Sequence, residues 1–257
     1  MQIKKIKKVA SNKYKIDFTN GDSIITYDNV ILENNILLKK EIDDSLYEEM
    51  LAQNDYYSIY SKIIKYITVK LRSEAEIKKY ISKYSCSQSI SERLIKQLKC
   101  EGLINDSRYI KAFIEDKVNL TNDGPIKIKN DLINMGMNEE EVSQFLSNYN
   151  DYIFYDKALS LAQKKVKLNH KDSSYILKQK IENFLFNLGY EQSMIKDVSA
   201  SVNISDNVVL EREIEKLYQK LKFKYNEEDL LNVIKQKLYK KGFSISDIKE
   251  ELIKYQK

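Results

Sequence analysis

The side chains that most often carry catalysis are few and scattered in this sequence. His170 is the only histidine, and it has no serine or cysteine partner in a recognisable nucleophile motif, so we expect a solvated loop residue. Cys86 and Cys100 have no partnering Cys or His pair, which predicts neither a zinc site nor a disulfide framework. The acidic runs at 43–44 and 139–141 are typical of helix starts, where the helix dipole favours carboxylates. The six glycines are dispersed and form no phosphate-binding loop. We therefore expect a protein that is not an enzyme and uses no cofactor or metal.

Cationic and aromatic side chains carry the remaining chemistry, which is binding to a polyanion or to an acidic protein surface. The lysines at 4, 5, 7, 8, 13 and 15 precede any acidic residue, and a phosphate contact and a solvated rim explain them equally well. The 19 tyrosines suggest base stacking, but Tyr60, Tyr66, Tyr80 and Tyr84 recur at helical intervals typical of packing. The pair at 56–57 is expected to be partly exposed.

Composition places these residues in a folded, helical protein. The 257 residues are 42% hydrophobic and 32% charged, which is enough apolar material for a core. A single proline suits long helices, and a net charge of +5 permits contact with a polyanion without requiring it. Because the N-terminus lacks the apolar run of a signal peptide and no stretch approaches about 20 apolar residues, we expect a cytoplasmic protein without a membrane segment. We also expect a monomer.

The first forty residues have a β pattern. Tyr14, Ile16 and Phe18 alternate with polar residues, and the turn dipeptide at 20–21 separates them from a second strand at 23–27. An isolated hairpin is marginal in water, so we expect a further strand near Ile3 or a covering helix near Val30.

Beyond residue 43 the spacing becomes helical and an internal repeat appears. Glycines at 136, 189 and 242 recur in steps of 53 residues, each between apolar residues at fixed offsets. Each glycine is expected to end a helix in the left-handed conformation. Amphipathic segments at 59–67, 108–118, 156–166 and 210–221 precede the helix pairs. The predicted fold class is therefore mainly α, with tandem three-helix repeats forming an elongated rod, straight or curved, after a small β-hairpin region. The predicted domains are 1–42 for the hairpin region and 43–100, 101–150, 151–203 and 204–257 for the four repeats.

Three segments between residues 70 and 136 carry a family resemblance. Residues 103–114 read LINDSRYIKAFI, residues 124–136 read GPIKIKNDLINMG, and residues 70–77 read KLRSEAEI. Asn105 and Asp106 are suited to cap the helix that carries Arg108, and Pro125 suits the first turn of a helix after Gly124. Together these segments resemble the RecX family.

The resemblance implies a regulator that binds the RecA–single-stranded DNA filament, inhibits its ATPase and strand-exchange activities, and modulates recombinational DNA repair. DNA contact would be direct or through RecA. The basic residues expected to contact the filament or DNA lie near the matched motif: Arg72, Lys78, Lys79, Arg93, Lys96, Arg108, Lys111, Lys127 and Lys129.

Two other functions fit the same pattern. The hairpin could act as a wing and one three-helix repeat as a helix-turn-helix reader, which would make the chain a direct DNA-binding protein. A general helical scaffold for another partner is disfavoured only by the resemblance.

Overall fold

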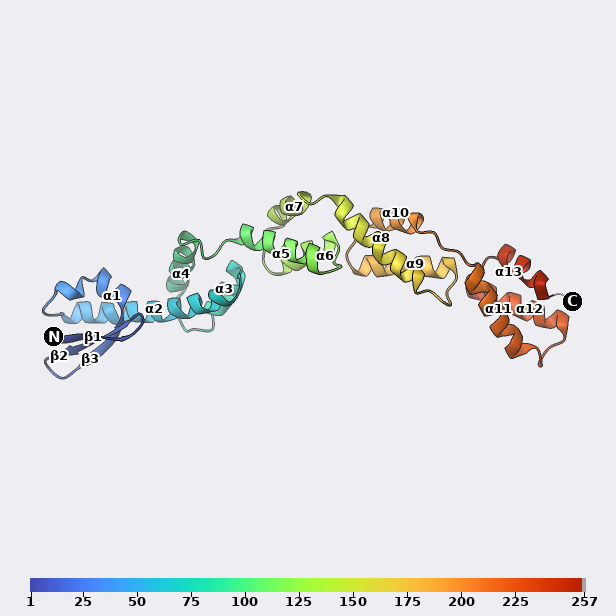
Figure 1. Cartoon of the computed structure of the whole chain (residues 1–257). Coiled ribbons are helices and arrows are strands. Elements are labelled where there is room, and N and C mark those ends of the chain that lie inside the picture. The colour runs from blue at the N-terminus through green and yellow to red at the C-terminus, as the bar shows by residue number, and fades with distance from the viewer. Residues whose placement is uncertain (256–257) are drawn as a thin grey trace. The chain divides into compact units, whose positions relative to one another are not determined.

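The computed structural model describes residues 1–255, apart from the side chain of Glu227, and consists mainly of helices with one small sheet near the N-terminus (Figure 1). The predicted fold class, mainly α with an N-terminal β region, is confirmed. The strands are β1 (Ile3–Ala10), β2 (Lys13–Phe18) and β3 (Ser23–Tyr27). The helices are α1 (Asp28–Glu33), α2 (Asp44–Val69), α3 (Glu74–Ile81), α4 (Gln88–Cys100), α5 (Asp106–Leu120), α6 (Pro125–Asn134), α7 (Glu139–Ser147), α8 (Asp151–Lys167), α9 (Ser174–Asn187), α10 (Gln192–Ser201), α11 (Asn207–Leu221), α12 (Glu227–Lys240) and α13 (Ile245–Leu252), with 3-10 turns η1 (Ile36–Leu38) and η2 (Ile253–Tyr255).

The sheet is an antiparallel meander in the order β1-β2-β3. Gly21 connects β2 to β3 with a φ of +95°, which a residue without Cβ adopts at little cost. Ile16 and Phe18 are buried against α1 and α2, and the Thr26 hydroxyl donates to Asn54 Oδ1 of α2 at 2.8 Å. The predicted hairpin is present, with both a third strand and covering helices.

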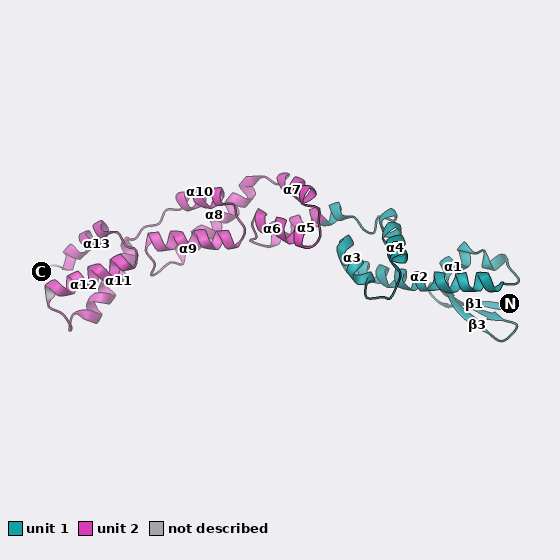
Figure 2. Ribbon diagram, turned by 180° about the vertical axis from the view of Figure 1, so that it is seen from behind, with its two compact units in different colours: residues 1–109 teal, residues 110–257 magenta. Residues whose placement is uncertain are grey.

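The helices after the sheet follow one another in sets of three. We call α2–α4, α5–α7, α8–α10 and α11–α13 the first to fourth sets. Each predicted repeat range contains one set, although the domain boundaries themselves stay a prediction, as does the rod shape. The chain forms two compact units, residues 1–109 and residues 110–257 (Figure 2). None of the helices in the described residues 1–255 is both long and apolar enough to span a bilayer.

The repeated glycines have the predicted conformation. Gly136, Gly189 and Gly242 have φ values of +87°, +82° and +83° after α6, α9 and α12. The apolar residues that flank them are buried, including Leu185 and Ile195 on either side of Gly189. Periodicity and turn chemistry therefore identified the helix ends correctly.

Two of these glycines also form junctions between consecutive sets within residues 110–257. Gly124 N donates to Leu188 O at 2.7 Å, and Ile126 N donates to Gly189 O at 3.0 Å. A Cβ on Gly189 would lie 2.4 Å from the Lys127 Cβ, so the two chain segments approach at a distance that only glycine permits. At the next junction, Ser173 Oγ donates to Lys241 O at 2.9 Å beside Gly242.

Two local expectations were wrong. Tyr56 and Tyr57 are buried rather than partly exposed, because their faces of α2 pack into the core beneath the sheet and α4, and their hydroxyls donate to Gln97 and Glu33. Asn105 caps α5 as predicted, accepting from Arg108 N at 2.8 Å. Asp106 does not share that role, because its carboxylate accepts from Glu74 N at the start of α3.

Candidate partner-binding surface

Helices α3 and α4 carry four of the nine predicted contact residues, Lys78, Lys79, Arg93 and Lys96. Ser73 and Glu76 begin α3 with a reciprocal pair of hydrogen bonds, each 3.1 Å, in which each side chain accepts from the backbone N–H of the other residue. Ile77 and Ile81 of α3 pack inward with Leu94 and Leu98 of α4. The lysines between these apolar positions are consequently directed to solvent.

A hollow of about 640 Å³ lies between α3 and α4 and collects three lysines. Glu74 pairs with Lys78 at 2.7 Å and with Lys99 at 2.5 Å, and both lysines line the hollow together with Lys96. Burial acts to raise the pKa of Glu74, but the hydrogen bonds from the two lysines outweigh it and hold the pKa below its ordinary value. The same contact raises the pKa of Lys99. The hollow is lined by these three lysines and by the carboxylates of Glu74 and Glu92, a surplus of one cation, and Lys96 forms no ion pair with any residue that the structure describes.

Lys99 was missed as a site residue. It stands three positions after Lys96 on α4, a spacing that places two side chains on one helix face. That spacing is visible in the sequence, but the pairing of Lys99 with Glu74 depends on how α3 packs against α4.

Arg72 belongs to the interior of this region rather than to its surface. Its guanidinium lies 3.8 Å from the centre of the Tyr66 ring and 3.0 Å from Glu76, and only 13% of its side chain is exposed. Tyr66 in turn stacks on Tyr80 with ring centres 4.2 Å apart. These contacts give Arg72 a structural role, so a charge reversal here would disturb the fold as well as any partner contact.

The remaining predicted cations of the first 109 residues are exposed. Arg93 lies over the Tyr56 ring at 4.8 Å, with its guanidinium at the protein surface. Lys79 on α3 and Arg108 on α5 form no ion pair within residues 1–255. The start of α5 is held next to α3 by the bond from Glu74 N to Asp106 Oδ1, at 2.9 Å.

The predicted cations of residues 110–257 differ in whether they form ion pairs. Lys127 pairs with Asp123 at 2.6 Å next to the Gly189 junction, where Lys117 also bridges Asp123 and Asp131. Lys129 pairs with Glu139 at 2.8 Å. Lys111 is exposed on α5. The paired lysines therefore contribute to contacts within the second set, and Lys111 remains a candidate for partner contact.

Several of the N-terminal lysines make local contacts. Lys7 and Lys15 lie 3.9 and 3.0 Å from Asp17, and Lys13 lies over the Tyr27 ring at 4.7 Å. These contacts favour the interpretation of the strand lysines as a solvated rim of the sheet.

Comparison with known proteins supports the resemblance seen in the central motif. Residues 151–198, most of α8 to α10, match the family model described as RecX, third three-helix domain. The chain is 29% identical over 265 residues to Regulatory protein RecX of Streptococcus agalactiae serotype III (strain NEM316), an alignment that covers 99% of this chain and 100% of the relative. It is also 29% identical to Regulatory protein RecX of Lactococcus lactis subsp. lactis (strain IL1403), covering 98% of this chain and 96% of the relative.

Solved structures show the same fold. A structure described as regulatory protein RecX aligns with a TM-score of 0.69 at 20% identity, covering 78% of this chain and 99% of that chain. RecX from Lactobacillus salivarius aligns with a TM-score of 0.55 at 23% identity, covering 57% and 95%. The similarity to RecX is thus confirmed in sequence along nearly the whole chain and in fold over more than half of it.

Proposed function

We propose that this chain, which resembles the RecX regulatory proteins along nearly its whole length, is a non-enzymatic regulator that binds the RecA–single-stranded DNA filament and inhibits its ATPase and strand-exchange activities. The observation that carries the proposal is the similarity to Regulatory protein RecX over 99% of this chain and 100% of the relative. Relatives with this name support a regulatory role, and the resemblance supplies RecA as the partner to test.

The exposed cations of residues 1–109 provide the contact chemistry. Lys79, Lys96 and Arg108 are exposed and form no ion pair with another described residue. An exposed cation without a partner can approach a phosphate or a carboxylate without first breaking an intramolecular pair. These three residues are therefore the proposed contact residues, and Lys96 lines the hollow together with Lys78 and Lys99.

The repetition of the three-helix sets supports binding to a polymer. A filament presents the same protein surface and the same backbone charge many times, and a chain with several similar sets can contact more than one repeat. Once one set is bound, the others act at a raised effective concentration, so weak contacts accumulate into stable binding.

The test is the steady-state ATPase rate of RecA on single-stranded DNA, titrated with the full chain at two salt concentrations. We expect inhibition at fewer than one chain per RecA protomer. Inhibition should vary modestly with salt, because the filament is recognised partly through protein contacts. An unchanged ATPase rate at saturating chain would refute the proposal.

A charge-reversed triple variant tests the contact surface. Lys79→Glu, Lys96→Glu and Arg108→Glu together should raise the inhibitory midpoint by about tenfold or more, because attraction becomes repulsion at three exposed positions. An unchanged midpoint in a folded variant would remove these residues from the site.

The matched control reverses three exposed cations of the same types at mid-helix positions in α9, α10 and α11. These substitutions are Lys178→Glu, Lys196→Glu and Arg212→Glu. They change the net charge by the same amount and should move the midpoint by less than about threefold if specific contacts outweigh bulk charge. Circular dichroism melting of both variants shows whether the fold is retained.

Binding to bare DNA, measured at the same two salt concentrations, separates direct DNA binding from filament recognition. Tight binding to bare DNA that weakens steeply with salt, without inhibition of RecA, would favour the wing and helix-turn-helix alternative.

A further inference from the structure

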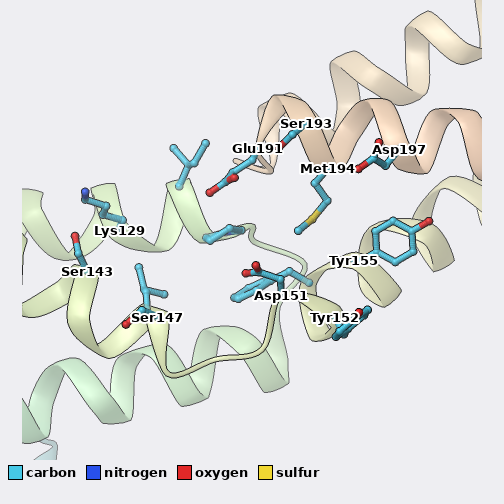
Figure 3. A pocket seen from close by; sticks show the side chains of 14 residues that line it. Lys129, Ser143, Ser147, Asp151, Tyr152, Tyr155, Glu191, Ser193, Met194 and Asp197 are labelled. Atoms are coloured by element: carbon cyan, nitrogen blue, oxygen red, sulfur yellow. The ribbon is translucent and has the colours of Figure 1, made fainter.

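A groove of about 470 Å³ lies between the second and third sets, within the unit of residues 110–257. The start of α6, the end of α7, the start of α8 and the first half of α10 form its walls. In Figure 3, Lys129 and Ser143 lie at one end of the groove, and Asp197 and Tyr155 lie at the other. A concavity of this size is within the range that accommodates inserted side chains of a ligand.

Several large apolar side chains line the groove among its polar residues. Phe154 lines it and is buried at 2% exposure, while the lining residues Met194 and Leu146 are partly exposed. Ile126 is 44% exposed and Tyr152 is 73% exposed. Large apolar side chains gathered around one concavity are the usual anchor points for an apolar segment of a partner.

The rim of the groove is acidic. Asp151, Glu191 and Asp197 are exposed lining residues, and none of them forms an ion pair with another residue that the structure describes. Glu191 stands at the N-cap of α10, yet its side chain makes no capping hydrogen bond. The lining includes one cation in the described part of the chain, Lys129, which Glu139 pairs at 2.8 Å.

The acidic rim stands out against the rest of the chain. The whole protein has a small excess of basic side chains, 43 against 38 acidic ones. Within the described residues, the groove is instead lined by three carboxylates without ion pairs and by one lysine that is already paired. Such a rim repels phosphate, so charge complementarity disfavours nucleic acid and favours a cationic partner.

We propose that this groove binds a helical segment of a partner protein in which aliphatic side chains on one face are flanked by lysine or arginine. The aliphatic side chains would insert between Met194, Ile126 and Tyr152, and the basic side chains would pair with Asp151, Glu191 and Asp197. An amphipathic helix with anchors at positions i, i+4 and i+7 has this chemistry. The assignment of the segment to the RecA protein of the filament, rather than to its DNA, rests on the proposed function.

Fluorescence anisotropy with the full-length chain tests the groove directly. The probe is a labelled amphipathic peptide with leucines at i, i+4 and i+7 and lysines beside them. Two comparison peptides carry glutamate in place of lysine, or serine in place of leucine. We expect saturable binding of the first peptide only. Equal binding of the lysine and glutamate peptides, or no binding of the lysine peptide, would overturn the proposal.

Two variants probe the rim and the apolar wall. Asp151→Asn, Glu191→Gln and Asp197→Asn together should weaken peptide binding about tenfold, as expected for three exposed ion pairs of modest strength. Tyr152→Ser should weaken it severalfold without changing the rim charge, and the high exposure of Tyr152 makes loss of the fold an unimportant contribution.

The matched control neutralises three exposed carboxylates outside the groove, with Asp116→Asn, Glu140→Gln and Asp156→Asn. It removes the same charge and should leave binding within about twofold. If it weakens binding as much as the rim variant, the effect is one of net charge and the groove is not the site.

The RecA ATPase titration distinguishes a failure of the groove from a failure of the proposed function. If the wild-type chain binds the lysine peptide but does not inhibit RecA, the function is wrong and the peptide site stands. If the wild-type chain inhibits RecA and the rim variant inhibits at the same midpoint, the assignment of the groove to RecA is overturned. A midpoint raised severalfold in the rim variant, but not in its control, supports the assignment.

Discussion

Replacement of Gly189 by alanine should open the junction between the turn after α9 and the start of α6. Two effects combine at this position. The φ of +82° costs a residue with a Cβ about 1–2 kcal/mol. The new Cβ would also lie 2.4 Å from the Lys127 Cβ and 2.5 Å from the Lys127 backbone nitrogen, and relief of such an overlap costs about 1–3 kcal/mol. The expected loss of local stability is therefore about 2–5 kcal/mol.

Two other glycines separate the two effects. Gly102 has a φ of +69°, and a Cβ added there would meet no atom within 4 Å, so Gly102→Ala should show the conformational cost alone, about 1–2 kcal/mol. Gly124 has an ordinary φ of −82°, but its Cβ would lie 2.5 Å from the Gly189 carbonyl carbon. Gly124→Ala should therefore show the overlap alone, reduced by about 0.4–1 kcal/mol because alanine restricts the unfolded chain.

Native-state hydrogen exchange is the appropriate assay, because a chain with two compact units need not unfold in one transition. The amides of Gly124 and Ile126 donate across the junction and report its opening. A loss of about 2–5 kcal/mol should speed their exchange by roughly 30-fold to several thousandfold. Exchange within threefold of the wild-type rate in Gly189→Ala would refute the reasoning. The loss of local stability is measured for each variant from the amides near its substitution. If Gly102→Ala loses as much local stability as Gly189→Ala, close packing is not the cause of the loss at Gly189.

Three further predictions follow from charged and capping residues. Arg72→Ala should lower the urea stability of residues 1–109 by about 1–3 kcal/mol, because it removes the ion pair with Glu76 and the stacking on Tyr66; a change below about 0.5 kcal/mol would contradict this. Burial acts to raise the pKa values of Glu74 and Glu76, but hydrogen bonds and nearby cations hold both below the ordinary 4.5. The contribution of these two carboxylates to the free energy of unfolding should therefore be constant above pH 5 and fall as the pH drops through their folded pKa values. Glu76→Gln should flatten that acid limb in pH-dependent urea titrations, and an unaltered slope would exclude Glu76 as a source. Ser173→Ala should cost about 1–2 kcal/mol, against about 0.5–1 kcal/mol for the exposed cap Ser244→Ala, because Ser173 is buried and also donates to the Lys241 carbonyl; equal melting temperatures for the two variants would contradict the difference.

Features that depend on neighbouring residues in the chain were predictable. The dipeptide at 20–21 and the alternation around it predicted the hairpin, which the structure contains as β2 and β3. Gly136, Gly189 and Gly242 predicted three helix ends, and all three have the left-handed φ. Each of these features results from steric preferences within a few residues, which amino-acid type largely decides.

The roles of individual polar side chains were less predictable. Arg72 comes two residues before α3 and stacks on Tyr66, whereas Arg108 lies in the first turn of α5 and is exposed, and residue type alone did not separate the two. Asp106 was expected to cap its own helix and instead accepts a hydrogen bond from Glu74 N, 32 residues earlier. The same offset recurs where Asp206 accepts from Ser174 N, so this contact between the start of one set and the middle of the preceding one occurs twice.

The sequence by itself determined the helical class, the sheet, the repeat and the similarity to RecX, because periodicity, turn residues and motifs are written along the chain. Tertiary structure alone decided that Gly124 and Gly189 approach one another, that Lys99 joins Lys78 at Glu74, and that three carboxylates surround an apolar groove. The physical reason is that packing brings together atoms far apart in sequence. The burial, pairing and exposure of a side chain depend on those neighbours rather than on the residues beside it.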